Sequence, residues 1–217
     1  MKKIVAFICC FFIIVALASE RKTDLTPDQA LGRLLEGNKR YVNSQLQHPH
    51  QSADRRHELE KTQHPFACIL ACADSRVPPE IVFDEGLGDL FVVRVAGNVA
   101  DDAVTGSIEY AVEHLGTPIV VVMGHQSCGA IEATIGGGEP KTHIQNLVEA
   151  IAPAVALARK ETGDLVANAV RVNVQLVVKQ LQQSKPILAG RVGTGGIRVV
   201  GAVYQFNSGE VTWLSEK

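Results

Sequence analysis

The sequence predicts a single α/β domain built on a central, mostly parallel β-sheet flanked by helices. Three apolar runs, at 66–71, 90–95 and 119–123, of which the second is interrupted only by Arg94, have the length of strands that are buried on both faces. The stretch 102–115 has helical spacing and lies between the second and third runs, which is the strand–helix–strand order of a parallel crossover. The chain has 217 residues, 46% of them hydrophobic, which suits one domain with a substantial core.

The N-terminus has the features of a secretory signal peptide covering 1–18. Lys2 and Lys3 precede an apolar run, 4–18, whose 15 residues fall short of the about 20 that span a bilayer. The run ends in the small-residue pattern A-L-A, so we expect cleavage near Ala18 and export to the periplasm or the medium. A short buried helix and a membrane anchor are the alternatives, and no stable membrane anchor is expected.

The segment 24–61 is expected to form an N-terminal helical arm ahead of the main domain, 62–217. Thr26 and Pro27 suit a helix N-cap and first turn, and the apolar residues that follow recur at helical spacing. The polar stretch 45–57 is expected to loop over the surface. This arm can pack on its own domain or on a partner chain.

The C-terminal half is expected to add further helices and an antiparallel edge hairpin. The predicted elements are helices at 129–135 and 143–183 and strands at 198–204 and 211–214. Pro153 and Gly163 are expected to break the long helical segment. Asn207, Ser208 and Gly209 lie between the two strands and favour a hairpin turn.

Chemically active side chains follow two of the predicted strands at their carboxyl ends, where ligands collect in parallel sheets. Cys72 ends the first apolar run, and His125 and Cys128 follow the third with two residues between them. One imidazole and two thiolates suit zinc, and three protein ligands leave a fourth position for water, as in catalytic sites. A lone cysteine at a strand end is more often a small buried hydrophobe, so spacing alone leaves the zinc interpretation open.

Asp74 and Arg76 share the C-A-D-S-R segment with Cys72. A carboxylate beside zinc either ligates the metal or accepts a hydrogen bond from its water. Arg76 can hold that carboxylate by a bidentate pair and keep it ionised. The alternative is an ordinary surface ion pair, which stabilises a fold little.

The number of cysteines and the overall charge argue against two other classes, disulfide-stabilised proteins and nucleic-acid-binding proteins. After cleavage three cysteines remain, and an odd number in an exported chain argues against a simple disulfide framework. Cys68 is expected to fill the core, although its C-x3-C spacing to Cys72 permits an oxidative bridge if zinc is absent. The net charge of −2 without a basic stripe excludes nucleic acid as a partner.

Four motifs in order carry a family resemblance. They are C-A-D-S-R with V-P-P-E, then D-L-F-V-V-R-V-A-G-N, E-Y-A-V-E-H-L and G-H-Q-S-C-G-A. Together, over about residues 63–131, they resemble the β-class carbonic anhydrases. The resemblance implies a catalytic domain at 62–217 and an enzyme, carbonate dehydratase, that reversibly hydrates carbon dioxide to bicarbonate and a proton.

The resemblance also implies a metal centre with one Zn²⁺ per chain. Cys72, His125 and Cys128 match the zinc ligands. Asp74 and Arg76 match the family's catalytic pair. In active members the carboxylate orients the water on zinc, and in closed members it leaves the arginine and becomes a fourth ligand.

Further matches concern the substrate cleft. Gln63, Phe91 and Tyr110 match residues that bind substrate or line the cleft, and His114 matches a proton-transfer histidine. The family cleft lies at a dimer interface and takes part of its lining from the partner chain, so a homodimer or homotetramer is expected. Ile69 stands where one bacterial subgroup has a tryptophan, which together with Gln63 and His114 favours the plant-like subgroup.

Two other functions compete with carbon dioxide hydration. One is hydrolysis of carbonyl sulfide or carbon disulfide on the same fold. The other is a non-catalytic zinc or redox protein that uses Cys68 and Cys72. Because thiolates donate more charge than imidazoles, the carbonic anhydrase interpretation further predicts activity that rises above neutral pH.

Overall fold

The computed structural model describes residues 23–138 and 141–215, so the predicted signal peptide lies outside the described residues. Five strands form one sheet in the order β2-β1-β3-β4-β5. The strands are β1 (Ala67–Ala71), β2 (Leu90–Arg94), β3 (Ile119–His125), β4 (Arg198–Tyr204) and β5 (Val211–Trp213). The first four run parallel, and β5 pairs with β4 in the antiparallel direction. The predicted fold class, including the edge hairpin, is confirmed.

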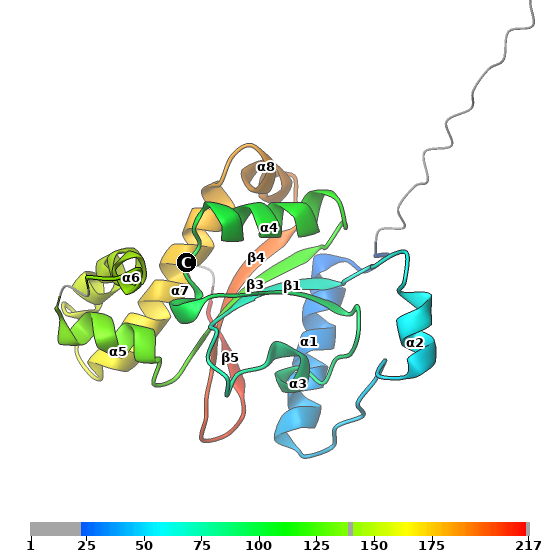
Figure 1. The fold of residues 1–217 in the computed structure, drawn as a ribbon, viewed down its shortest axis with the longest axis horizontal. Helices are drawn as coiled ribbons and strands as arrows, with labels where there is room; N and C mark the ends of the chain where they lie inside the picture. The colour runs from blue at the N-terminus through cyan, green and yellow to red at the C-terminus, as the bar shows by residue number, and fades with distance from the viewer. Residues whose placement is uncertain (1–22, 139–140, 216–217) are drawn as a thin grey trace, which may run out of the picture.

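Helices cover both faces of this sheet. They are α1 (Pro27–Val42), α2 (Ala53–Glu58), α3 (Pro79–Val82), α4 (Asp102–Glu113), α5 (Gly129–Gly136), α6 (Ile144–Ala158), α7 (Leu165–Gln183) and α8 (Ile187–Gly193), with the 3₁₀ turn η1 (Ala96–Asn98). In Figure 1, α4 and α8 lie together above the strands, whereas α1 and α3 lie together at the lower right. No helix among the described residues is both long and apolar enough to cross a membrane.

The alternation of side chains along the strands divides the core between the two faces. Ile69 and Val121 pack on the face covered by α1 and α3. Cys68, Leu70 and Val120 pack on the opposite face against α4, α7 and α8. Because both faces are covered, the central strands are apolar throughout, and all five β1 residues are buried.

A third apolar cluster lies beyond the carboxyl ends of the strands. It combines residues of α5, α6 and the first half of α7 with Cys72 and Cys128. Figure 1 shows α5 and α6 side by side at the left of the sheet, next to α7. The two cysteines therefore lie where the sheet ends and this helical layer begins.

The long helical segment differs from its prediction in one respect. Pro153 lies inside α6 and does not end it, and only the stretch around Gly163 separates α6 from α7. A proline removes one helical hydrogen bond, but Ile151, Ala154 and Val155 bury apolar surface on both sides of it. Helices α3 and α8 were not predicted. Helix α3 has only four residues, and α8 lies in a Gly-rich stretch.

The N-terminal segment is held by its cap and by its buried face. Thr26 and Gln29 form a capping box at the start of α1, as the sequence predicted for the cap position. Ala30 and Leu34 of α1 are fully buried against the sheet, so this helix packs on its own domain. The polar stretch predicted as a loop contains the short helix α2.

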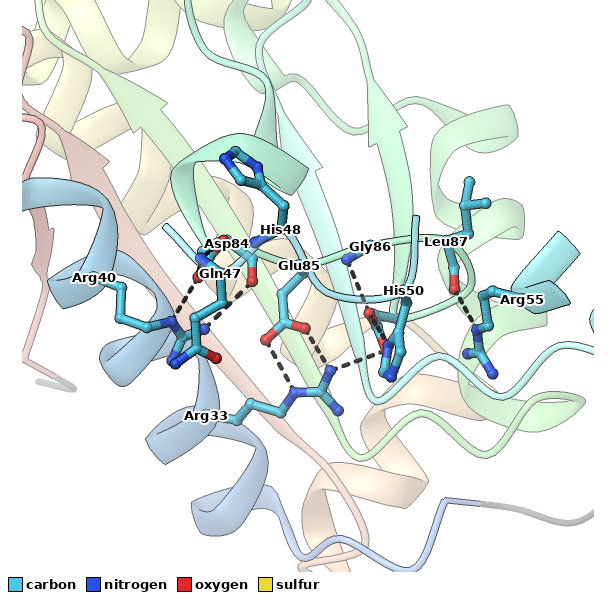
Figure 2. Close-up of polar contacts among 11 residues, drawn as sticks. Arg33, Arg40, Gln47, His48, His50, Arg55, Asp84, Glu85, Gly86 and Leu87 are labelled. Carbon is cyan, nitrogen blue, oxygen red and sulfur yellow. Dashed lines mark hydrogen bonds and ion pairs between the residues drawn. The ribbon is translucent and has the colours of Figure 1, made fainter. Parts of the chain in front are cut away.

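Ion pairs fasten the same helix to the loop between α3 and β2. Figure 2 shows that Arg33 pairs with Glu85 and Arg40 with Asp84. Arg33 also pairs with Asp89. The side chains of the three carboxylates are only 1–5% exposed. We call these five residues the arm clasp.

Candidate zinc site

Three potential metal ligands converge at the carboxyl edge of the sheet. Cys72 follows β1, His125 ends β3, and Cys128 is the N-cap of α5. One donor atom from each lies within 4.8 Å of the others, and the two sulfurs are 4.0 Å apart. All three residues are buried, which keeps solvent ions away from the donors. The structure thus brings together the three residues that the sequence predicted as zinc ligands.

The histidine is prepared to bind a cation. Its Nδ1 lies 2.9 Å from the carbonyl oxygen of Gln126, so Nδ1 carries the proton and donates it there. Its Nε2 is buried and has no hydrogen-bond partner among the described residues. A buried lone pair without a partner is costly, and a metal ion would satisfy it. This fixed tautomer is the usual arrangement of metal-binding histidines.

The two thiols share one proton, which leaves Cys72 in the thiolate form that binds zinc. A hydrogen bond from the neighbouring Cys128 thiol lowers the pKa of Cys72 to about 4. This effect outweighs that of burial, which alone would raise the pKa. The amide of Gly97 also donates to the Cys72 sulfur at 3.3 Å. The same shared proton and burial raise the pKa of Cys128. Two thiolates and one imidazole fit Zn²⁺ well.

The amide of Gly97 reaches this sulfur only because the chain turns sharply in η1. Gly97 has a φ of +71°, a conformation that favours glycine. A Cβ atom there would lie 2.7 Å from the Cδ1 atom of Ile151 in α6. A glycine at this position therefore satisfies both the turn and the packing of the layer behind Cys72.

Asp74 faces Arg76 and lies beside the ligand set. Arg76 donates from Nε to Oδ1 at 2.9 Å and from Nη2 to Oδ2 at 2.7 Å, and its backbone amide reaches Oδ1 at 3.0 Å. These bonds, chiefly those from the guanidinium, lower the pKa of Asp74. Oδ2 lies 3.7 Å from Nε2 of His125. The carboxylate is thus paired with arginine and adjacent to the metal position.

One aromatic residue near this pair was missed in the sequence. Phe206, in the hairpin turn after β4, lies under the Arg76 guanidinium at 4.3 Å and contacts the His125 ring edge-on at 5.6 Å. Stacking on an aromatic face helps to hold a guanidinium in place. No local signal reveals this contact, because the hairpin is remote from both partners in the sequence.

The other predicted site residues lie at the opposite end of the strands. Phe91 pairs in register with Cys68, four residues before Cys72. Its ring lies 6.2 Å from that of Tyr110, which lies 5.1 Å from that of His114. Gln63, Tyr110 and His114 line one cavity of about 480 Å³. Within one chain, these residues are separated from the zinc ligands by the length of a strand.

Cys68 fills the core as expected, and the bridge to Cys72 that their spacing permitted is excluded by the strand geometry. Cys68 lies inside β1 and Cys72 directly follows it, so four extended residues place their Cα atoms about 13 Å apart. A disulfide requires Cα atoms less than about 7 Å apart. Cys68 is instead a fully buried thiol on the face covered by α4 and α7.

Comparison with known proteins agrees with this site. The family model described as carbonic anhydrase matches residues 67–211. "Carbonic anhydrase 2" of Mycobacterium tuberculosis is 44% identical over 187 residues, which cover 84% of this chain and 90% of that protein.

Two solved structures show the same fold. The Coccomyxa β-carbonic anhydrase in complex with acetazolamide has a TM-score of 0.69 and 28% identity, and the match covers 86% of each chain. A tetrameric β-carbonic anhydrase from Sordaria macrospora has a TM-score of 0.70 and 23% identity, covering 86% of this chain and 97% of that one. This chain therefore belongs to the β-class carbonic anhydrase family, and the predictions of that family, its zinc requirement and its carbon dioxide chemistry are confirmed.

Proposed function

We propose that this site hydrates carbon dioxide reversibly with Asp74 as the residue that orients the attacking water and Arg76 as the residue that holds Asp74. The observation that carries this assignment is the position of the carboxylate. It is bound by Arg76 through both oxygens and lies 3.7 Å from Nε2 of His125. The carboxylate is therefore next to the metal position without occupying it.

Each residue has a separate task in this mechanism. Cys72, His125 and Cys128 would hold zinc, which when bound supplies a Lewis acid that lowers the pKa of water to about 7. Asp74 stays ionised beside Arg76, so it can only accept a hydrogen bond. Water that donates to Asp74 keeps a lone pair free to attack the carbon of carbon dioxide. The products are bicarbonate and a proton.

Replacing Asp74 tests this assignment. Asp74→Asn keeps the shape but presents an amide that can donate, so water is no longer oriented by a pure acceptor. We expect kcat for carbon dioxide hydration to fall about 100-fold or more, with zinc content unchanged. Stopped-flow hydration and metal analysis on the same sample measure both. Unchanged kcat at full zinc content would exclude the role of Asp74.

The same purified protein should be assayed with the competing substrates. Carbonyl sulfide and carbon disulfide are linear and apolar, like carbon dioxide, and the pairing of Asp74 with Arg76 does not distinguish them. We expect carbon dioxide to have the highest kcat/KM. A higher value for either sulfur compound would assign the site to that hydrolysis.

We further propose that a second copy of the chain completes the cleft with Gln63, Phe91, Tyr110 and His114. In support, these residues form one cluster around a cavity but lie a strand length from the zinc ligands of their own chain. Tyr110 is among the exposed large apolar side chains. His114 would then transfer the product proton from the partner's side, and the Sordaria relative is described as tetrameric.

Mixed dimers decide whether the cleft is shared. Cys72→Ala removes a zinc ligand and Gln63→Ala alters the lining, so each homodimer has two impaired sites. If the cleft is shared, each mixed dimer has one intact site, and random mixing restores about a quarter of wild-type activity. If each chain lines its own cleft, mixing restores nothing.

We also propose export through a cleaved N-terminal signal and membership of the plant-like subgroup. Export is supported by the two lysines, the 15-residue apolar run and the A-L-A pattern. The subgroup is supported by Ile69, Gln63 and His114. Intact-mass measurement of protein from the medium or periplasm should show a chain that begins after Ala18. Full-length protein confined to the cell interior would exclude export.

A further inference from the structure

Arg94 is bound to the segment that carries Asp74. It is the last residue of β2 and pairs in register with Ala71. Its Nε donates to the carbonyl oxygen of Cys72 at 3.0 Å, and its Nη2 donates to the carbonyl oxygen of Asp74. One guanidinium thus connects the backbone of a zinc ligand to the backbone of the proposed water-orienting residue.

The backbone needs such a donor at this point because the sheet ladder ends there. The last ladder bonds between the two strands are Val95 N to Ala71 O and Ala73 N to Val95 O, each 3.2 Å. Beyond Val95 the chain leaves the sheet and enters η1. The carbonyl of Cys72 lies just beyond the last residue of β1, and the Arg94 side chain donates to it.

The carbonyl of Asp74 accepts a second bond that defines the turn. The amide of Val77 donates to it at 3.1 Å, which closes a turn over 74–77. Arg76 lies inside this turn and donates to the carboxylate. Fixing the Asp74 carbonyl therefore fixes the direction in which the Asp74 and Arg76 side chains leave the turn.

We propose that Arg94 is a positioning residue for carbon dioxide hydration, which aligns the Asp74 carboxylate by holding the carbonyls of Cys72 and Asp74. This inference rests on the proposed role of Asp74. Arg94 makes no contact with the Asp74 carboxylate or with the three ligand atoms in the hydrogen bonds of the described residues. Its effect on the reaction is therefore transmitted through the backbone.

The role requires the fork of arginine and not only its charge. A guanidinium presents Nε and Nη2 in one rigid plane and can bind two acceptors at a set spacing, whereas a lysine ammonium is a single point donor on a flexible stem. Arg94→Lys keeps the positive charge beside Asp74 and loses the fixed two-point contact. This substitution separates positioning from simple electrostatic support.

The experiment compares Arg94→Lys with Arg159→Lys as a matched control. Arg159 also donates to a backbone carbonyl, that of Ile135 at 3.0 Å, but holds the ends of α5 and α6. We expect Arg94→Lys to lower kcat by about 10- to 100-fold, the range expected for a misplacement of about 1 Å, with KM, zinc content and melting temperature unchanged. Arg159→Lys should retain wild-type kcat.

A double-mutant cycle with Asp74→Asn tests the route of the effect. If Arg94 acts through the Asp74 carboxylate, Arg94→Lys should lower kcat less than about twofold in the Asp74→Asn background. Equal losses in both backgrounds would overturn the proposal, as would full activity of Arg94→Lys. A fall in zinc content parallel to kcat would also overturn it, because Arg94 would then hold Cys72 rather than Asp74.

A second variant and one control outcome complete the test. Arg94→Gln keeps one amide donor and removes the charge, so it should show a kcat loss at least as large as Arg94→Lys, and a smaller loss would overturn the proposal. If Asp74→Asn alone leaves kcat unchanged, the proposed role of Asp74 fails. The proposal for Arg94 fails separately, if Asp74→Asn is impaired but Arg94→Lys causes the same kcat loss in both backgrounds.

Discussion

The molecule contains two sets of arginine–carboxylate pairs that differ in burial. In the arm clasp, the side chains of Asp84 and Glu85 are each 1% exposed, and arginines of α1 cover them. At the zinc site, Asp74 is 17% exposed and its partner Arg76 is 55% exposed. The chemistry of the pair is the same in both places, and only the surroundings differ.

This difference separates a structural pair from a functional one. A buried carboxylate has lost its water, so removing its partner leaves an uncompensated charge and destabilises the fold. An exposed pair adds little stability, and the bonds that Arg76 makes instead fix the direction of Asp74 next to His125. We therefore expect lesions at the site to change activity and lesions in the clasp to change stability.

Zinc removal should produce the largest effect and only at the site. Chelation takes away the ion that the sulfurs of Cys72 and Cys128 and Nε2 of His125 are placed to bind, so activity should fall to background. The far-ultraviolet circular dichroism of the chain should be retained, because the clasp and both main core clusters contain no ligand. Re-added zinc should restore activity. Substantial activity at less than about 0.1 zinc per chain would contradict the separation.

Arg40→Met should produce a large stability loss by breaking one buried pair of the clasp. It leaves Asp84 buried with only the backbone amides of Gln47 and His48, at 3.0–3.1 Å, as donors. Breaking such a pair costs about 3 kcal/mol, which urea unfolding measures directly. Arg55→Met is the matched control, since Arg55 pairs with the exposed Glu58. Equal costs for the two variants would refute the burial argument.

The zinc site was predictable from the sequence because its information is local. Cys72, Asp74 and Arg76 lie within five residues at the end of β1. His125 and Cys128 lie within four residues at the end of β3. A parallel sheet brings such ends to one edge. Each short segment therefore had a readable role before the fold was known.

The arm clasp was not predictable by the same reasoning. Arg33 and Glu85 are 52 residues apart, and Arg40 and Asp84 are 44 apart. Nothing in the local sequence links the arginines of 33–40 to the carboxylates of 84–89. Only the packing of α1 on the sheet decides that they meet. The contact of Phe206 with Arg76 likewise depends on tertiary structure, namely the position of the hairpin between β4 and β5.

The two clasp carboxylates should respond to pH in opposite directions. Burial opposes the charge of Asp84, but the bonds from Arg40, Gln47 and His48 outweigh it and lower its pKa below 3.8. Its contribution to stability is therefore present above that value and lost as the pH falls through the lower folded pKa. Burial raises the pKa of Glu85 above 4.5, so its contribution is present below that value and lost as the pH rises.

Urea unfolding between pH 4 and 7 checks this opposition. The cost of Asp84→Asn should be the same or larger at pH 7 than at pH 4, whereas the cost of Glu85→Gln should be larger at pH 4. The two variants remove neighbouring charges of one loop, so each is the control for the other. Parallel pH profiles for both would show that the clasp titrates as one unit.

Cys68 extends the comparison to a buried group with no charged partner, and its expected effect is the smallest. Burial alone raises the pKa of this thiol from 9.0 to about 12. Because the folded pKa is raised, the contribution of Cys68 to stability is present below pH 9 and is lost as the pH rises toward 12. The unfolded chain ionises first, so wild-type protein should lose about 1 kcal/mol from this group by pH 10.

The Cys68→Ala variant tests this expectation. Between pH 8 and 10 its free energy of unfolding should fall by about 1 kcal/mol less than that of the wild-type protein. Val120→Ala, at the position paired with Cys68 in β3, should cost the same at both pH values. Equal pH slopes for Cys68→Ala and the wild type would mean that the thiolate reaches solvent, and that burial alone does not decide how a group in this sheet titrates.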